Sequence, residues 1–335
     1  MPVSSFLRAL LLSLLLGLPG LASAGDPLVI AHRGASGYLP EHTLPAATLA
    51  HAQGADFLEL DLVMTRDGHL VVIHDLTLNT TTNVQEVFPE RTGGGSKAWV
   101  MDFDLAEIRQ LSAHERRGRS GDTAAFPERF PLSRQIFQVP TLEEMLDLVQ
   151  GLNQTLKREV GVYIEVKGWE AHQSRGLNPV LKLMEVLDRY GYRESTDPVW
   201  IQSFDDVALQ ELRQAGSRLK RVQLLGENNW RMTSTDFDFL KTPEGLQAIS
   251  GYADGIGPWI NQVLTGRSSS GEAQATSLVE EAHSLGLAVH VYTLRQDRLP
   301  RYVDTFEELL ELLLNQVRVD GVFTDHPDQV VRFLK

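Results

Sequence analysis

Short apolar runs alternate with amphipathic stretches along most of this 335-residue chain, and this alternation constrains the fold more than any other feature. Apolar strands that alternate with helices indicate a parallel sheet whose faces are covered by helices. Nine runs have the length and composition of strands. They begin at Leu28, Phe57, Leu70, Val160, Val199, Arg221, Gly255, Ala288 and Gly321.

The run at Leu70 follows the run at Phe57 too closely to be its parallel neighbour, because a parallel crossover needs a dozen or more residues. Without it, eight strand–helix units remain. Eight is the number in a TIM (β/α)8 barrel, where catalytic residues lie at the carboxyl ends of the strands. The alternative is an open doubly wound sheet, but no G-x-G-x-x-G follows any predicted strand. We therefore predict an α/β fold of the TIM-barrel type.

Residues 76–140 show little periodicity, and only Asp104 to Leu111 is predicted to be helical. A connection of this length is unusual in a compact domain unless it forms a functional loop or cap. We therefore predict a cap subdomain, inserted after the third strand-like run. The next helix is predicted to begin at Thr141, because Thr141 and Glu144 have the spacing of a capping box.

The first residues have the pattern of an export signal. Arg8 precedes an apolar run, Ala9–Leu18, and Ala22-Ser23-Ala24 is an A-x-A cleavage site. The apolar run is about half of the ~20 residues that span a bilayer, so cleavage is favoured over an uncleaved membrane anchor. We predict a signal peptide at 1–24 and the barrel at 25–335, with export to the periplasm or out of the cell and no stable membrane insertion.

The composition excludes several kinds of partner and cofactor. A net charge of −13 disfavours general binding to nucleic acids. The chain has no cysteine, which excludes disulfides and any zinc or iron–sulfur site built on thiolates. The oligomeric state has no signal in the sequence.

The stretch Phe57–Asp75 joins two alternating apolar segments through an Asp67-Gly68 turn, which indicates a β-hairpin. Glu59 and Asp61 are two residues apart, so in a strand their carboxylates point to the same face. With a two-residue turn, the numbers of paired residues add up to 135, which sets His74 opposite Asp61. The plainer interpretation is an ordinary hairpin whose acids face solvent.

Polar and aromatic residues end most of the predicted strands. They are His32 and Arg33, Glu59 and Asp61, Glu165 and Lys167, Gln202, Trp259, Tyr292 and Arg295, and Asp325. Glu59, Asp61 and Glu165 are hard oxygen ligands, which suit Ca²⁺ or Mg²⁺. We take Gln202, Trp259 and Tyr292 as candidates for the substrate pocket, although aromatic residues at strand ends often serve packing.

The remaining residues at the strand ends suit a phosphate ester. Arg33 offers a planar fork to phosphate oxygens, and Lys167 adds a point charge. His32 and His74 titrate near neutrality, so one can act as a base and the other as an acid. Cations, carboxylates and histidines at one rim predict cleavage of a phosphodiester. The plainer interpretations are an ion pair between Glu165 and Lys167 and a buried, hydrogen-bonded His32.

Ordered motifs over nearly the whole chain resemble those of the glycerophosphodiester phosphodiesterases, especially the periplasmic type that carries an insertion. The motifs are His32-Arg33-Gly34-Ala35, Pro40-Glu41-His42-Thr43, Glu59-Leu60-Asp61, Thr65-Arg66-Asp67-Gly68, His74-Asp75, Val139-Pro140-Thr141-Leu142-Glu143-Glu144, Glu165-Val166-Lys167, Gln202-Ser203-Phe204-Asp205 and Asp320-Gly321-Val322-Phe323-Thr324-Asp325. Each motif alone is weakly specific, but the ordered set is highly specific.

The resemblance implies a TIM barrel of the phospholipase C-like phosphodiesterase type. It implies hydrolysis of glycerophosphodiesters, which are deacylated phospholipids, to sn-glycerol 3-phosphate and an alcohol. The implied site has Ca²⁺ (Mg²⁺ as the alternative) at Glu59, Asp61 and Glu165, acid and base at His32 and His74, and phosphate at Arg33 and Lys167. Tyr292 stands where a tryptophan is familiar in other members, which affects only the shape of the pocket.

Two alternatives stay open at this point. One is a phospholipase D-like enzyme on the same barrel that acts on intact lipids, although the absence of cysteine counts against its secreted forms. The other is a non-catalytic, calcium-dependent binding protein. The sequence does not distinguish the preferred alcohol, the acid from the base among the histidines, or water from the substrate's own glycerol hydroxyl as the nucleophile.

Overall fold

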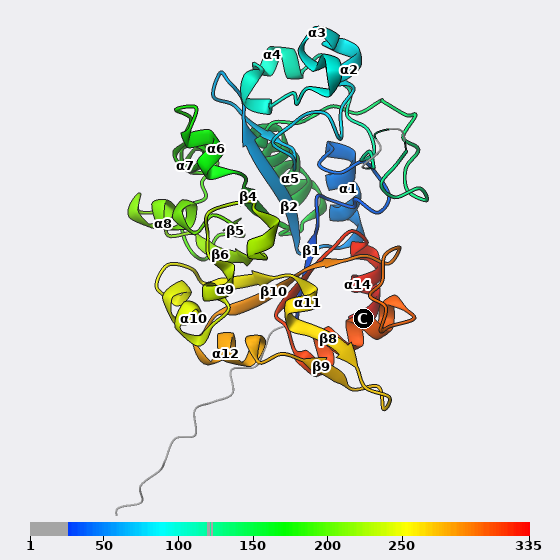
Figure 1. Ribbon diagram of the computed structural model, residues 1–335, viewed down its shortest axis with the longest axis vertical. Helices are drawn as coiled ribbons and strands as arrows, with labels where there is room; N and C mark the ends of the chain where they lie inside the picture. The colour runs from blue at the N-terminus through cyan, green and yellow to red at the C-terminus, as the bar shows by residue number, and fades with distance from the viewer. Residues whose placement is uncertain (1–25, 119–120, 122) are drawn as a thin grey trace, which may run out of the picture.

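The computed structural model describes residues 26–118, 121 and 123–335, and its main element is a closed barrel of eight parallel strands (Figure 1). The predicted signal peptide, residues 1–24, lies outside the described residues. The strands follow one another around the barrel in chain order, and the first strand pairs with both the second and the last. The predicted TIM (β/α)8 fold is confirmed.

The barrel strands begin within one residue of the predicted positions. They are β1 (Leu28–Ala31), β2 (Phe57–Met64), β4 (Gly161–Val166), β5 (Val199–Ser203), β6 (Lys220–Leu225), β7 (Gly255–Pro258), β10 (Ala288–Leu294) and β11 (Gly321–Thr324). A short strand, β3 (Leu70–Val72), pairs antiparallel with β2. A second hairpin pairs β8 (Leu264–Arg267) with β9 (Ala273–Ala275).

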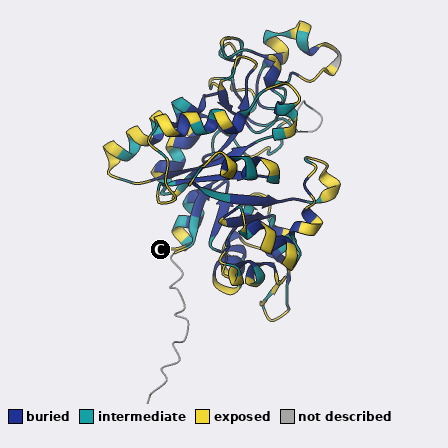
Figure 2. Cartoon of the chain, turned by 90° about the vertical axis from the view of Figure 1, so that its left-hand side faces the viewer, coloured by how far each residue is buried: buried dark blue, intermediate teal, exposed yellow. Residues whose placement is uncertain are grey.

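Helices cover the barrel on its outside, with their exposed faces turned to solvent and the strands buried between them (Figure 2). The helices outside the inserted segment are α1 (Leu44–Gln53), α5 (Leu142–Leu156), α6 (Trp169–Gln173), α7 (Pro179–Arg189), α8 (Asp206–Gln214), η3 (Asn228–Trp230), α9 (Phe237–Leu240), α10 (Pro243–Ser250), α11 (Ile260–Val263), α12 (Leu278–Ser284), α13 (Phe306–Leu310), η4 (Glu311–Val317) and α14 (Pro327–Phe333). The predicted capping box begins α5: the Glu144 N–H donates to the Thr141 hydroxyl. Among the described residues, no helix has the length and apolar character needed to cross a bilayer.

Alternation along β2 separates the packing side of the strand from its chemical side. Leu58, Leu60 and Leu62 belong to the apolar cluster between the strands and the outer helices. Glu59 and Asp61 lie between them in the sequence, so they point into the barrel. Both carboxylates are buried, with 2% and 1% of their residue surfaces exposed. The shared face predicted for the two acids is therefore the barrel interior.

The hairpin register differs by one residue from the prediction. Met64 pairs with Leu70, and the Thr65 N–H donates to the His69 carbonyl at 2.8 Å, so paired numbers add up to 134. The connecting loop has three residues, 66–68, rather than two. Its last residue is glycine with a φ of +87°, as in hairpin loops that end in a left-handed residue.

The predicted pairing of His74 with Asp61 is therefore wrong. Asp61 lies opposite Ile73, whose N–H donates to the Asp61 carbonyl at 2.9 Å. A continued strand would turn the His74 side chain toward the outer helices. Instead β3 ends at Val72, and the chain leaves the strand and brings His74 to the barrel mouth.

Within residues 76–140, the part that carries short helices forms a layer over the β2–β3 hairpin (Figure 1). These are α2 (Val84–Val87), α3 (Pro89–Thr92), η1 (Gly93–Gly95), η2 (Val100–Asp102) and α4 (Leu105–Ile108). The layer has its own apolar cluster, in which Phe103 and Ile108 pack with Val63 and Val71 of the hairpin. This packing holds the inserted segment beside the carboxyl ends of the strands.

Candidate active site

A cavity of about 520 Å³ opens at the carboxyl ends of the barrel strands. The predicted site residues that line it are His32, Arg33, Glu59, His74, Glu165, Lys167, Gln202, Trp259 and Tyr292. Asp61 is not on the cavity wall, but it lies buried beside residues that are. The structure thus brings together residues from β1, β2, β4, β5, β7 and β10.

His32 follows β1 and forms a hydrogen-bonded pair with an aspartate from the other end of the chain. Its Nδ1 lies 2.6 Å from Oδ1 of Asp325, which follows β11, the strand next to β1. Burial, with a contribution from Arg33, lowers the pKa of His32 to about 4, although Asp325 acts in the opposite direction. His32 is therefore neutral at pH 7, and its Nε2 is left for a substrate.

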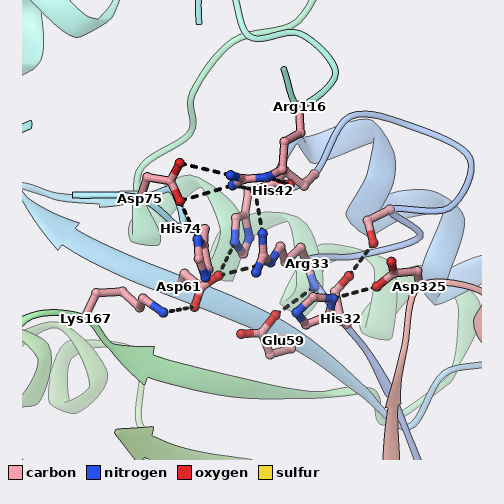
Figure 3. A network of polar contacts seen from close by, with 12 residues as sticks. His32, Arg33, His42, Glu59, Asp61, His74, Asp75, Arg116, Lys167 and Asp325 are labelled. Atoms are coloured by element: carbon pink, nitrogen blue, oxygen red, sulfur yellow. Dashed lines mark hydrogen bonds and ion pairs between the residues drawn. The ribbon is translucent and has the colours of Figure 1, made fainter. Parts of the chain in front are cut away.

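His74 forms a second pair of the same kind. Its Nδ1 lies 2.6 Å from Oδ1 of Asp75, the next residue in the chain. Burial, together with Arg33 and Lys167, lowers the pKa of His74 to about 3. The cavity thus has two neutral histidines, and a carboxylate fixes the Nδ1 side of each (Figure 3).

Three carboxylates meet between the two histidines. Asp61 pairs in register with Glu165 on β4, and Glu59 lies two residues before Asp61 on the same inner face. Burial, together with the charge of Asp61, raises the pKa of Glu165 to about 8, although Lys167 acts in the opposite direction. Burial and the charge of Asp61 also raise the pKa of Glu59 well above its usual range. Burial acts in the same direction on Asp61, but Lys167, His74 and His42 keep its pKa well below the usual range. Additional positive charge is needed to keep all three ionised.

The donor set at this point fits a metal ion. His42, Glu59 and Asp61 each offer a ligand atom, and these atoms lie within 4.8 Å of one another. Oδ1 of Asp61 is buried and makes no hydrogen bond, so it has a free lone pair in a place that water does not reach. Two carboxylates and an imidazole suit a divalent cation. The sequence pointed to Glu165 as the third ligand, whereas in this structure its carboxylate lies 2.7 Å from Nζ of Lys167.

The two predicted phosphate ligands lie on either side of the carboxylates. Nζ of Lys167 is 3.6 Å from Oδ1 of Asp61, and Nε of Arg33 is 3.5 Å from Oδ2 of the same residue. Arg33 has a φ of +58°, an uncommon conformation for a residue with a side chain. Its backbone N–H donates to Glu59 at 2.7 Å, so the turn after β1 is tied to β2.

The opposite wall of the cavity is aromatic. Trp230 and Trp259 meet edge to face with ring centres 5.6 Å apart, and Phe204 and Tyr292 do so at 5.8 Å. The Tyr292 hydroxyl donates to the Leu225 carbonyl at 2.7 Å, which holds this wall in place. The cavity therefore has a charged half and an apolar half.

The sequence did not identify every residue of this site. Glu41, His42, Asp75, Arg116 and Asp325 all contact predicted site residues or their partners. Glu41, His42, Asp75 and Asp325 lie in motifs that carry the family resemblance, and that position was a usable signal. Arg116 lies in the aperiodic inserted segment, where no pattern marked it.

The fold and the cavity together define an α/β barrel with two histidine–aspartate pairs at its mouth and a group of side chains that could hold a cation. Residues 32–329 match the glycerophosphoryl diester phosphodiesterase family. The chain belongs to this family, and it is an enzyme with glycerophosphodiester phosphodiesterase activity. This outcome sets aside the non-catalytic alternative.

Similar proteins support the same family. The chain is 39% identical over 328 residues to the glycerophosphodiester phosphodiesterase of Haemophilus influenzae, covering 92% of this chain and 90% of that one. It is 32% identical over 330 residues to the Treponema pallidum enzyme of the same name, covering 93% and 92%. The crystal structure of a glycerophosphodiester phosphodiesterase from Agrobacterium tumefaciens has a TM-score of 0.61 and 24% identity, covering 91% and 99%, and supports the fold.

Proposed function

We propose that this enzyme hydrolyses glycerophosphodiesters, the deacylated forms of phospholipids, to sn-glycerol 3-phosphate and an alcohol in a Ca²⁺-dependent reaction. One observation carries the proposal: two histidine–aspartate pairs lie on either side of a cluster of buried carboxylates in one cavity (Figure 3). Acid and base groups on both sides of a charged centre suit in-line displacement at phosphorus, where one oxygen enters as another leaves.

The histidines divide the proton transfers between them. His32 and His74 are neutral at pH 7, so either one can accept the proton of the attacking hydroxyl group. A bound phosphodiester is an anion, and an anion raises the pKa of a nearby imidazole. The second histidine then carries a proton, which it donates to the departing alkoxide.

The cations of the site hold the phosphate. Arg33 and Lys167 lie at the cavity wall, where a planar guanidinium and an ammonium can bind non-bridging oxygens. Glu59, Asp61 and Glu165, with His42 as a further donor, would hold the Ca²⁺ or, alternatively, Mg²⁺. When bound, the ion neutralises charge on the phosphate and in the transition state.

A product assay with and without metal tests this proposal. Release of glycerol 3-phosphate from glycerophosphocholine and glycerophosphoethanolamine should stop with a chelator and return with Ca²⁺. Glu59→Gln should lose most of the activity, while the control Glu280→Gln, at an exposed position on α12, should keep it. Undiminished activity after complete metal removal would contradict the metal dependence.

A phospholipase D-like activity on intact lipids is the rival within the same barrel. The apolar wall of the cavity is the observation that favours it, because acyl-bearing substrates need apolar surface. Comparing a micellar phospholipid with its deacylated diester distinguishes the two. We expect turnover of the diester and little turnover of the lipid.

We also propose export to the periplasm, supported by the signal pattern in residues 1–24. Cell fractionation should find the mature chain, beginning at Gly25, outside the cytoplasm. A chain without residues 1–24 should stay in the cytoplasm, and export of that shortened chain would contradict the assignment.

A further inference from the structure

The inserted segment supplies two arginines that reach the barrel mouth. Arg116 and Arg129 both lie in residues 76–140, and their side chains are 18% and 5% exposed. A buried arginine is costly unless its charge is paired, so the carboxylates that these two arginines contact are needed to hold them there. Neither residue lies on the cavity wall.

Arg116 binds the aspartate behind His74. Its terminal nitrogens lie 2.9 Å from Oδ2 and 3.3 Å from Oδ1 of Asp75. The same guanidinium binds both carboxylate oxygens of Glu41, at 2.8 and 2.7 Å. Glu41 in turn accepts a hydrogen bond from Arg33 at 3.0 Å. Figure 3 shows the Arg116 guanidinium beside the Asp75 carboxylate, with His74 below Asp75.

Arg129 binds the aspartate behind His32 in the same way. Its Nη2 lies 2.7 Å from Oδ2 of Asp325, the oxygen that does not face His32. It also makes two bonds to Asp297, at 2.7 and 3.0 Å. Arg295, from the end of β10, binds the same Asp325 oxygen at 2.7 Å, so this aspartate has two cationic partners.

The two arrangements follow one pattern. In each, histidine Nδ1 contacts Oδ1 of an aspartate, and Oδ2 of that aspartate accepts a hydrogen bond from an arginine of the insertion. A carboxylate held at both oxygens cannot rotate, so the plane of the imidazole is fixed as well. The insertion is therefore more than a cover over the hairpin.

We propose that Arg116 and Arg129 are positioning residues, which orient the two histidines of the active site without touching them. Arg116 acts on His74 through Asp75. Arg129 acts on His32 through Asp325. The inference rests on the proposed acid–base roles of the histidines and adds a task for the inserted segment: completing the catalytic geometry of the barrel.

The test measures steady-state kinetics of Arg116→Met and Arg129→Met, which keep an apolar side chain and remove the guanidinium. Arg109→Met is the matched control. Arg109 also ties the insertion to the barrel, through Glu144 at 2.7 Å, but it does not contact either histidine or the aspartate behind it. We expect kcat on glycerophosphocholine to fall about 10- to 100-fold for Arg116→Met, with KM changed less. The fall for Arg129→Met should be smaller, because Arg295 still holds Asp325. Arg109→Met should keep the wild-type kcat.

A change of leaving group separates positioning from general stability. An aryl ester of glycerol phosphate releases a phenoxide, which needs no proton from an acid. If His74 is the acid, Arg116→Met should recover much of its kcat on the aryl ester and Arg129→Met should not. If His32 is the acid, the reverse is expected. Equal losses on both esters for both variants, or equal losses for Arg109→Met, would overturn the proposal.

A double mutant tests the route through the aspartate. Arg116→Met should cost little more kcat when it is added to Asp75→Asn, because the carboxylate that it orients is already neutral. Independent, multiplying losses would mean that Arg116 acts another way, for example through Glu41 and Arg33, and would overturn the assigned route. If a methionine variant does not fold, Arg116→Lys and Arg129→Lys replace it, with a smaller fall in kcat expected at an unchanged Tm.

The same series tells apart a failure of this inference and a failure of the proposed mechanism. His32→Ala and His74→Ala are measured in parallel. Inactive histidine variants beside fully active arginine variants overturn only the positioning role. Active histidine variants overturn the acid–base mechanism itself.

Discussion

The two ends of the barrel interior are built from the same strands but have different roles, packing at one end and chemistry at the other. At the amino-terminal end, inward side chains form an aromatic layer: Phe57, Tyr163, Trp200, His290 and Phe323. Two residues further along the same strands, the inward side chains form the mouth layer: Glu59, Glu165, Gln202, Tyr292 and Asp325. The step of two is the strand period, so one sequence pattern places packing below and chemistry above.

The difference shows how a barrel separates stability from function. In the lower layer, Tyr163 contacts four aromatic rings at 5.0–6.1 Å, and its hydroxyl lies 2.8 Å from Nδ1 of His290. Gly161 leaves the room that the ring of Phe57 occupies, since a Cβ there would lie 2.4 Å from it. In the mouth layer, like charges are buried together and raise one another's pKa values. Substitutions at the two ends should therefore have separable effects.

The largest effect is expected on catalysis at the mouth. His74→Ala should lower kcat about 10²- to 10⁴-fold, because it removes a proton-transfer group. The free energy of unfolding should change little, since the side chain is 31% exposed. The control is His69→Ala, next to the hairpin loop and with a side chain that is 46% exposed, which should keep full activity. A wild-type kcat in His74→Ala would contradict the assignment of catalysis to the mouth end of the barrel.

The next effect is expected on stability at the lower end. Tyr163→Ala should lower the free energy of unfolding by about 3–5 kcal/mol, because it leaves a large cavity among aromatic rings. Tyr163→Phe should cost about 1 kcal/mol for the lost hydrogen bond to His290. Urea unfolding measures both, and kcat per folded molecule should be unchanged. A loss of turnover at full stability would show that the lower layer also serves catalysis.

The buried histidine of the lower layer, His290, should make the free energy of unfolding depend on pH. Burial lowers the pKa of His290 to about 4 from the model-peptide value of 6.5. Between pH 6.5 and pH 4 the unfolded chain binds the proton and the folded chain does not, so stability falls as the pH falls through this window. The contribution is about 3 kcal/mol, since each pKa unit corresponds to ~1.4 kcal/mol.

His290→Gln should flatten this acid-side slope in urea titrations at several pH values. His283 provides a control of opposite sign, because its hydrogen bond to Asp320 raises its pKa. That pair stabilises the folded state below the unfolded pKa and loses the contribution as pH rises through the folded pKa. An unchanged acid-side slope in His290→Gln would mean that other buried histidines, and not His290, cause the acid sensitivity.

The smallest effect is expected in the hairpin loop that leads to the mouth. Gly68 has a φ of +87°, and a Cβ there would meet only Cε of Met64 at 3.7 Å, an ordinary contact. Gly68→Ala should therefore cost about 1 kcal/mol of unfolding free energy from backbone conformation alone, without a clash. Turnover should stay the same. A fall in kcat would show that the loop, as well as the end of β3, sets the position of His74.

Much of the fold could be predicted because it depends on local patterns. Apolar runs and helix caps repeat at the spacing of a barrel, and the carboxylates of Glu59 and Asp61 share a face whatever surrounds them. The hairpin register could not be derived from Asp67-Gly68 alone, since the same dipeptide can also end a three-residue loop. The predicted register was wrong by one residue because the prediction assumed a two-residue turn.

The amino-acid sequence by itself determined the barrel, the strand ends at which chemistry collects, and most of the side chains in the cavity. Only the tertiary structure decided that His42 joins Glu59 and Asp61 as a third donor and that Arg116 and Arg129 bind the aspartates behind the histidines. The physical reason is distance along the chain. Arg129 lies 196 residues from Asp325, and no periodicity links an aperiodic loop to a strand end so far away.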